Sequence, residues 1–248
     1  MQTIMQKVVF KDLGRMNYQE AWDYQEALLK ENVLIKTAAR QRAEAGAGGD
    51  AMGNAGAVED TTNYLLFVEH PPVYTLGKSG HEEHILIDGD KRTERGVEFF
   101  RTNRGGDITF HGPGQLVGYP ILDLEKFRTD LGWYLRSLEE VGIRVLADYG
   151  ISGDRSRGET GIWIDPGIRG RERKICAMGV RCSRWITMHG FALNMNTDLR
   201  WFSDIVPCGI PDKQVTSLEK ELGHRVDEAE VKTKWKMRFE EVFDAVID

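Results

Sequence analysis

The chain of 248 residues has little cysteine, and its three cysteines form no Cys-x-x-Cys pair. Such a small, odd number argues against a disulfide scaffold and against structural zinc, and it favours reduced thiols. The chain also lacks an apolar run of membrane-spanning length, and its first residues lack the apolar segment of a secretory signal. We therefore expect a cytoplasmic protein that does not associate with a membrane.

Positive charge is scarce as well, because 39 acidic residues outnumber 33 lysines and arginines and leave a net charge of −6. This balance argues against nucleic acid as a partner. Hydrophobic residues make up 41% of the chain and charged residues 29%, which is typical of a globular protein with a sizeable core. The length fits one large domain or at most two small ones, and we expect a single catalytic domain over residues 1–248.

The order of predicted elements indicates the fold class. Asn17 and Asp130 each precede a helical apolar pattern, Thr216 with Glu219 forms a capping box, and a last amphipathic helix closes the chain. These helices do not alternate strictly with strands. We therefore expect an α+β fold with a mixed, largely antiparallel sheet flanked by helices. Short apolar runs predict strands at 8–10, 64–68, 73–76, 85–87, 116–124, 161–164, 174–180 and 187–195.

Two stretches of the chain depart from the regular strand and helix patterns. Pro120 lies inside the predicted strand at 116–124, which favours an edge or bulged strand. Residues 38–60 are rich in Ala and Gly and nearly free of large apolar side chains, which predicts a flexible surface insertion without chemistry.

His81 and His84 are close enough for a metal pair, but such pairs in polar loops are usually solvated, so we expect no metal and no cofactor.

A glycine-rich segment over residues 104–115 is the first candidate for a binding site. Its glycines allow a ligand to approach the backbone closely, although a tight turn between strands explains them equally well. The segment lacks both the Gly-Lys-Ser/Thr ending of a phosphate-binding loop and the Gly-x-Gly-x-x-Gly dinucleotide pattern. It is therefore neither of these two nucleotide sites.

A second candidate is Lys174, which begins an otherwise apolar strand. In a regular strand Lys174 shares a face with Cys176 and Met178. Its ammonium either snorkels to solvent or is desolvated, and a desolvated lysine is fit to exchange protons.

Cys208 is the candidate nucleophile. It lies between Pro207 and Gly209, residues that favour an exposed turn. Only a few per cent of a free thiol is thiolate at neutral pH, so a neighbouring cation would activate it. Lys174, His111 and His189 are available, and a Cys–His pair indicates a hydrolase whereas a Cys–Lys pair indicates acyl transfer. The spacing of these residues along the sequence does not decide between a Cys–His and a Cys–Lys pair.

These segments together resemble the lipoyl(octanoyl) transferase family, from the first strand to about residue 220 apart from the 38–60 insertion. The matching motifs are Arg104-Gly105-Gly106, His111-Gly112-Pro113-Gly114-Gln115, Lys174-Ile175, Ala177-Met178-Gly179, Arg184-Trp185, His189-Gly190-Phe191-Ala192-Leu193-Asn194 and Pro207-Cys208-Gly209.

The resemblance implies the catalytic fold of biotin and lipoate protein ligases. It also implies octanoyl (or lipoyl) transfer from acyl carrier protein to a lysine of lipoyl domains, the first step of endogenous protein lipoylation. Acceptors would be subunits of 2-oxoacid dehydrogenases and the glycine-cleavage H protein. Cys208 matches the acyl-thioester nucleophile and Lys174 the lysine that lowers the pKa of that thiol. The matching substrate-binding residues are Arg104, Gly105, Gly106, Asp107, Ile108, Thr109, Phe110, His111, Ala177, Met178, Gly179, Gly190, Phe191 and Ala192.

Several alternatives remain at the level of sequence. Cys176 lies two residues from Lys174, about 7 Å along a strand, and is a rival nucleophile. An ATP-dependent ligase, a Cys–His hydrolase and a non-catalytic acyl-binding module compete with the transferase. An arginine-rich stretch beside Lys174 is either a docking patch for an acidic carrier protein or a solvated loop, and it contains Arg155, Arg157, Arg169, Arg171 and Arg173.

Overall fold

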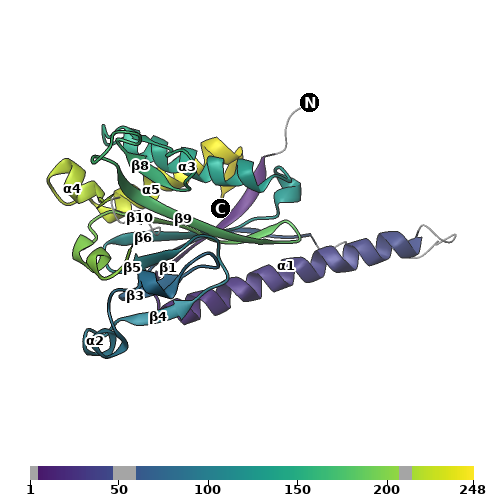
Figure 1. The fold of residues 1–248 in the computed structure, drawn as a ribbon. Helices are drawn as coiled ribbons and strands as arrows, with labels where there is room; N and C mark the ends of the chain where they lie inside the picture. Colours follow the sequence, from purple (N-terminus) through teal and green to yellow (C-terminus); the bar gives the residue numbers. More distant parts are fainter. Residues whose placement is uncertain (1–4, 47–59, 207–213) are drawn as a thin grey trace.

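A large mixed sheet forms the centre of the molecule, which we describe from a computed structural model that covers residues 5–46, 60–206 and 214–248. Its strand order is β12-β1-β2-β6-β10-β9-β8-β7, with β11 beside β9 (Figure 1). The pairs β12–β1, β1–β2 and β11–β9 are parallel, and the other pairs are antiparallel. The strands are β1 (Gln6–Arg15), β2 (Asn63–Glu69), β6 (Gln115–Ile121), β7 (Gly153–Asp154), β8 (Ile162–Ile164), β9 (Arg173–Ser183), β10 (Ile186–Asn194), β11 (Gln214–Val215) and β12 (Ala245–Ile247).

A smaller sheet lies beside the main one in the order β4-β3-β5. The prediction of a strand at 85–87 is wrong, because within the described residues Ile85 forms a single bridge, with Ile205, after the 3₁₀ turn η1 (Glu82–His84). This run of three apolar residues is too short to pair along its length, and the Leu86 side chain is 60% exposed. The strands of this sheet are β3 (Val73–Leu76), β4 (Glu98–Arg101) and β5 (Ile108–His111).

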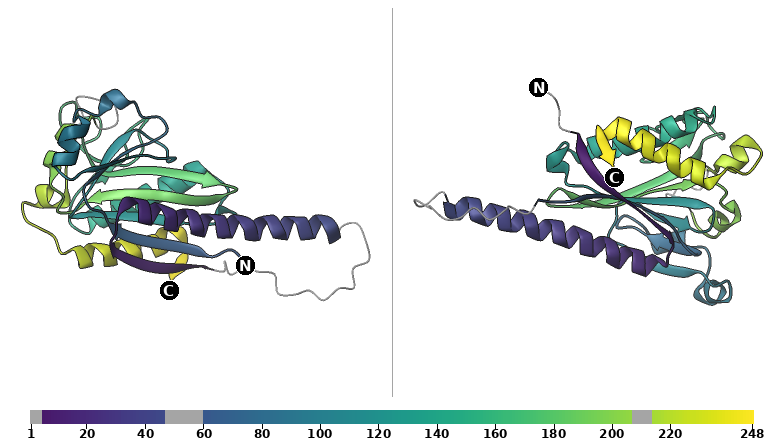
Figure 2. Two further views of the ribbon diagram at one scale, coloured as in Figure 1. Left: turned by 90° about the horizontal axis from the view of Figure 1, so that it is seen from below. Right: turned by 180° about the vertical axis from the view of Figure 1, so that it is seen from behind.

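Helices cover both faces of the main sheet, as the two views of Figure 2 show. α3 (Leu131–Ala147) and α5 (Glu228–Phe243) cover one face, and α1 (Tyr18–Gly46) crosses the other and extends beyond the strands. The predicted α+β class with a mixed, largely antiparallel sheet is confirmed. In the described ranges, no helix combines the length and the apolar character needed to cross a membrane. The remaining helical segments are α2 (Gly89–Glu94), α4 (Leu218–Leu222), η2 (Leu124–Lys126) and η3 (Leu199–Asp204).

The core has one layer on each face of the main sheet. Under α3 and α5 the Phe191 ring stacks on Trp235, with ring centroids 3.8 Å apart, among Leu138, Val141 and Phe239. Asp130 begins α3 by accepting a hydrogen bond from the Trp133 backbone N–H, as the sequence predicts. The second layer joins α1 to the sheet through Ala21, Leu28, Leu29, Val117, Met188 and their neighbours. The central strands β6 and β10 are thus buried on both sides.

The predicted insertion at 38–60 begins too early, because α1 continues through residue 46. Ala, Arg, Gln and Glu dominate this stretch and are strong helix formers, so a helix that has already started propagates through them. Ion pairs hold the helix in place here: Lys36 Nζ lies 2.7 Å from Asp123 Oδ1, and Arg40 lies 3.2 Å from Glu125. Residues 47–59 lie outside the described part of the chain.

Pro120 lies in an interior strand, and the expectation of an edge or bulged strand is therefore wrong. β6 pairs with β2 on one side and β10 on the other. The ladder with β10 ends at Gly118, so the ring at position 120 removes no hydrogen bond from that side. The Pro120 carbonyl instead accepts a hydrogen bond from Thr187 Oγ1 at 2.9 Å.

The capping box predicted at Thr216 is displaced by one residue. Ser217 caps α4 by accepting a hydrogen bond from the Lys220 backbone N–H. Thr216 instead donates its hydroxyl proton to Glu221 at 2.5 Å. Gly223 ends the helix with a φ of 79°, a left-handed conformation suited to glycine.

Candidate functional site

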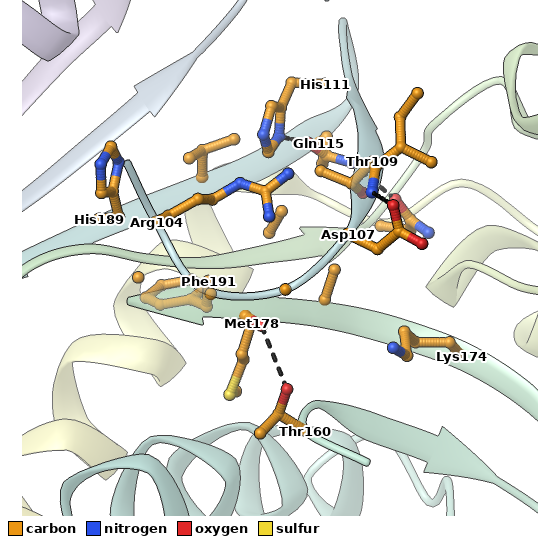
Figure 3. Close-up of a pocket in the computed structure, with 18 of the residues that line it drawn as sticks. Arg104, Asp107, Thr109, His111, Gln115, Thr160, Lys174, Met178, His189 and Phe191 are labelled. Atoms are coloured by element: carbon orange, nitrogen blue, oxygen red, sulfur yellow. Dashed lines mark hydrogen bonds between the residues drawn. The ribbon is translucent and has the colours of Figure 1, made fainter. Parts of the chain in front are cut away.

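A cavity of about 370 Å³ lies between the small sheet and the centre of the main sheet (Figure 3). Its volume is within the range of small-molecule sites. β5, β6, β9 and β10 form its walls together with the glycine-rich segment before β5, and the loop before β8 closes one side. Tyr18 reaches the cavity from the start of α1, and Val215 reaches it from β11. The three motif-bearing segments of the sequence thus meet around one space.

Most of the predicted substrate-binding residues line this cavity. They come from the glycine-rich segment and from the neighbouring strands β9 and β10, which pair Gly179 with Gly190 and Met178 with Phe191. Lys174 lines the same cavity from the beginning of β9. The lining residues that the sequence predicted are Arg104, Gly106, Asp107, Ile108, Thr109, His111, Lys174, Ala177, Met178, Gly179, Gly190, Phe191 and Ala192.

Gly105 and Phe110, also predicted to bind substrate, are not among the residues that line the cavity. Residues alternate across β5, so Phe110 points away from Thr109 and His111. Its fully buried ring stacks on Trp201 at 5.4 Å between centroids. Gly105 donates its backbone N–H to the Val180 carbonyl at 2.9 Å and so attaches the glycine-rich segment to β9.

Close approach of neighbouring backbone segments explains why glycine is needed at two positions of the wall. A Cβ atom at Gly179 would lie 2.6 Å from the Gly105 carbonyl oxygen, and one at Gly190 would lie 2.2 Å from the Gly118 carbonyl oxygen. Both distances are shorter than a side chain tolerates, and both obstacles are backbone. The cavity wall is therefore built by direct packing of one backbone on another.

Buried polar side chains fill the side of the cavity away from Lys174. Figure 3 shows Lys174 and His189 on opposite sides with Arg104 between them. The Arg104 guanidinium donates to the Thr75 carbonyl at 2.6 Å and to Thr75 Oγ1 at 2.9 Å. Gln115 accepts a hydrogen bond from His111 Nδ1 at 2.8 Å. Arg104 and His111 are therefore held rigidly by the fold.

His70 and His189 complete this polar group. His70 Nδ1 lies 2.8 Å from the Met16 carbonyl oxygen, which makes Nδ1 the protonated nitrogen, and Nε2 then accepts the Tyr119 hydroxyl proton at 2.7 Å. His189 has a φ of 58°, which is strained for a residue with a side chain, and its Nε2 lies 2.7 Å from Asn103 Oδ1. The surroundings thus set each ring as a neutral tautomer.

Burial keeps these histidines uncharged. It lowers the pKa of His70 to about 4 and of His189 to about 3, and it lowers the pKa of His111 well below its usual value. For His189 the charges of Arg104 and Arg181 add to the effect of burial. At these three histidines the unfolded chain therefore binds more protons than the folded chain near and below pH ~6.5.

We expect the free energy of unfolding to fall on acidification, by about 1 kcal/mol per buried histidine between pH ~7.5 and ~5.5. The sign follows because each histidine with a lowered pKa resists protonation only in the folded state. Denaturant unfolding at the two pH values measures the effect. His70→Gln should reduce the pH dependence by about one histidine's share, whereas His81→Gln, at an exposed ring, should not change it. An unchanged pH dependence in His70→Gln would contradict this assignment.

Lys174 faces the cavity because β9 is irregular beside it. β8 pairs Trp163 with Lys174 but Ile162 with Cys176, so Ile175 is an extra residue, a β-bulge. Lys174 Nζ lies 4.5 Å from the centre of the Trp163 ring and 3.9 Å from Glu159 Oε2. Its side chain is 11% exposed. The ammonium is therefore held inside the site, not at the protein surface.

Cys176 belongs to the core under α3 and not to the cavity lining. It is fully buried, its Sγ lies 3.7 Å from the Ala177 carbonyl oxygen, and burial raises the pKa of its thiol. A buried thiol in apolar surroundings is inert. The expectation that Cys176 shares the face of Lys174 is wrong, because the bulge at Ile175 breaks the alternation.

Cys208 lies outside the described residues, but the chain on either side of it is placed. The Val206 backbone N–H donates to the His84 carbonyl at 2.8 Å, and His84 Nδ1 bonds Asp107 Oδ2 at 2.6 Å. Asp107 and Val215 both line the cavity, and Val215 pairs with Lys174. The described chain therefore reaches the cavity wall both before and after the segment that carries Cys208.

Sequence reasoning did not assign several lining residues to the site. Tyr18 lies at the start of α1, Tyr119 is hidden in an apolar strand, and Glu159 with Thr160 occupies a loop without a recognisable pattern. The aromatic residues carried no signal, because an aromatic side chain in a helix or strand usually indicates core. His189, which the sequence offers as a partner for the Cys208 thiol, also lines the cavity.

Comparisons with known sequences agree on one family. Residues 17–240 match the family described as the lipoyl protein ligase A/B catalytic domain. An octanoyltransferase of Christiangramia forsetii is 51% identical over 96% of this chain and 97% of its own length. An octanoyltransferase of Flavobacterium johnsoniae is 52% identical over 97% of this chain and 98% of its own length.

Solved structures show the same fold at lower sequence identity. A bipartite lipoate protein ligase from Thermoplasma acidophilum superimposes with a TM-score of 0.65 and 17% identity, over 99% of this chain and 86% of its own. A lipoate-protein ligase A bound with ATP gives a TM-score of 0.65 at 15% identity, over 99% of this chain and 87% of its own. At these identities the likeness establishes the fold alone.

Proposed function

Because the chain belongs to the lipoyl protein ligase A/B catalytic-domain family, and about half of its residues are identical to those of octanoyltransferases, we propose that it is an octanoyltransferase. The main support for the proposal is that about half of the residues are identical over nearly the full length of both chains. The whole chain acts as one catalytic domain. The donor is octanoyl-acyl carrier protein, and the acceptors are lysines of lipoyl domains in 2-oxoacid dehydrogenase subunits and in the glycine-cleavage H protein. The reaction takes place in the cytoplasm and requires no cofactor.

The cavity is suited to an eight-carbon chain. Apolar side chains from β5, β6, β9 and β10 are part of its lining, and a saturated chain gains free energy by leaving water for such a surface. Lys174 lies at one side, near the place where the described chain approaches and leaves the segment with Cys208. The apolar residues concerned are Ile108, Val117, Ala177, Met178, Phe191 and Ala192.

The first half-reaction exchanges one thioester for another. The Cys208 thiolate attacks the octanoyl carbonyl carbon and forms a new carbon–sulfur bond, and the bond to the carrier thiol breaks. Lys174, as ammonium, stabilises the thiolate before attack and gives its proton to the departing thiolate. The two thioesters are nearly equal in free energy, so no ATP is consumed.

The second half-reaction moves the acyl group to nitrogen. The acceptor amine attacks the Cys208 thioester, a carbon–nitrogen bond forms, and the carbon–sulfur bond breaks. The neutral Lys174 accepts the proton that the amine nitrogen loses. Cys208 leaves as thiolate and Lys174 is again ammonium, so the enzyme returns to its starting state. The product amide is more stable than the thioester, which drives the reaction forward.

The arginine-rich stretch offers little support for carrier docking. Arg155 donates to Glu139 at 3.1 Å and to Glu140 at 2.8 Å. Arg173 donates to Asp165 at 2.7 Å and to Glu221 at 2.6 Å. These two cations already have carboxylate partners within the chain.

ATP-free transfer is the test of the proposed function. The experiment mixes the purified chain with octanoyl-acyl carrier protein and a lipoyl domain in the absence of ATP. Mass spectrometry then measures the mass of the lipoyl domain. We expect an octanoyl increment on the lipoyl domain and none when its target lysine is replaced by arginine. Release of free octanoate without transfer would indicate a hydrolase. A requirement for ATP with free octanoate would indicate a ligase.

A further inference from the structure

Glu159 lies beside Lys174 in the cavity and has no assigned role. Its side chain is 16% exposed, it lines the cavity, and its Oε2 atom lies 3.9 Å from Lys174 Nζ. A carboxylate and an ammonium that are both this poorly hydrated interact more strongly than the same pair at a surface. This pair therefore lies in the cavity that we propose for the octanoyl chain.

The loop that carries Glu159 is fixed to two neighbouring elements. The Gly161 backbone N–H donates to Glu139 Oε1 at 3.0 Å, and Glu139 is buried in α3. Thr160 donates its hydroxyl proton to the Met178 carbonyl on β9 at 3.4 Å. Gly161 has a φ of 110°, and a Cβ atom there would lie 2.5 Å from the Cys176 carbonyl oxygen. Glu159 is therefore held at the cavity by its neighbours.

Trp163 limits the position of Lys174 from another direction. It faces Lys174 across the β8–β9 ladder, and its ring centre lies 4.5 Å from Nζ. The face of an indole ring attracts a cation. The bulge at Ile175 turns Lys174 toward the cavity. There the Glu159 carboxylate and the face of the Trp163 ring together confine the Lys174 ammonium.

We propose that Glu159 is a positioning residue that holds the Lys174 ammonium in the geometry required for thioester exchange. This proposal rests on the proposed function, which assigns to Lys174 the proton transfers described above. Glu159 exchanges no proton itself; it acts through Lys174. Loss of the carboxylate should leave the acyl slot intact and misplace the ammonium, and displacements of this kind cost up to ~10²-fold in rate.

Three variants test the role of Glu159. Glu159→Gln keeps the shape and removes the charge, and Glu159→Asp keeps the charge on a shorter side chain. Glu98→Gln, at an exposed position of β4 outside the cavity, is the matched control. We expect single-turnover acylation by octanoyl-acyl carrier protein to slow about 10- to 100-fold in Glu159→Gln, with partial recovery in Glu159→Asp and no change in the control. Affinity for octanoyl-acyl carrier protein should stay within about twofold.

A double-mutant cycle separates positioning from a structural role. If Glu159 acts through Lys174, then Glu159→Gln should slow acylation in the wild-type background and have no further effect in a Lys174→Met background. Equal slowing in both backgrounds would overturn the proposal, as would normal acylation with slowing only of the later transfer to the lipoyl domain. Wild-type chain that forms no adduct and transfers no octanoyl group would instead contradict the proposed function.

Discussion

Replacing Cys208 by alanine is expected to abolish the octanoyl adduct and to lower the rate of transfer by on the order of 10⁴-fold or more, because removal of a nucleophile eliminates the covalent route. Replacing Cys176 by alanine is expected to leave both the adduct and the transfer rate close to wild type. The difference between the two variants is the decisive result, because the sequence alone made both thiols candidates for the nucleophile.

The surroundings of the described cysteines explain this expectation. Cys176 packs in the core among apolar side chains that include Ile162 and Ile175, and burial raises the pKa of its thiol. Burial also raises the pKa of Cys182, which lies next to the β9–β10 hairpin turn and is absent from the cavity lining. Only the thiolate is an effective nucleophile. Neither thiol is therefore a good candidate for attack at the cavity.

Mass spectrometry of peptides from the acylated chain measures the site of attachment. The wild-type chain and Cys176→Ala should carry the octanoyl group on Cys208, and Cys208→Ala should carry none. Cys176→Ala should lose about 1 kcal/mol of stability from the small cavity it creates, which serves as a check that Cys176 is a core residue. An octanoyl group on Cys176 in the Cys208→Ala variant would contradict the assignment.

The comparison of Cys176 with Lys174 shows where sequence periodicity stops being informative. Alternation along a strand correctly predicted β9 but placed Lys174 and Cys176 on one face, because a pattern of period two assumes a regular ladder. The bulge at Ile175 depends on how β8 pairs with β9, which is a contact between distant parts of the chain. No local signal in the sequence of β9 reports that pairing.

Pro120 and Glu159 illustrate the same limit in other parts of the fold. The strand at Pro120 was predicted, but its interior position depends on its pairing with both β2 and β10, and the proline fits there because the ladder with β10 ends at Gly118. The glycine-rich segment, β9 and β10 were each recognised by their motifs, and their meeting around one cavity followed from the family resemblance, not from spacing. Glu159 belongs to no sequence motif. A single carboxylate in a loop is usually a solvated surface charge, and only the structure shows that this one lies beside Lys174.

Replacing Lys174 by methionine is expected to slow acyl-enzyme formation by about 10²- to 10⁴-fold, the usual contribution of a positioned acid or base. Methionine fills a similar volume beside Trp163 without the charge, so packing is largely retained. Lys174→Arg should behave differently. A guanidinium keeps the positive charge beside the thiolate but does not lose its proton at neutral pH, so it is a poor substitute for the base of the second half-reaction.

Single-turnover experiments resolve the two half-reactions. Octanoyl-acyl carrier protein is added first and adduct formation is followed, and the lipoyl domain is added afterwards. Lys174→Met should be slow in both steps, whereas Lys174→Arg should form the adduct faster than Lys174→Met and then retain it. Lys91→Met, at an exposed lysine of α2, is the control. If Lys174→Met forms the adduct at the wild-type rate, Lys174 does not activate the nucleophile; if Lys174→Arg transfers as fast as wild type, Lys174 is not the base.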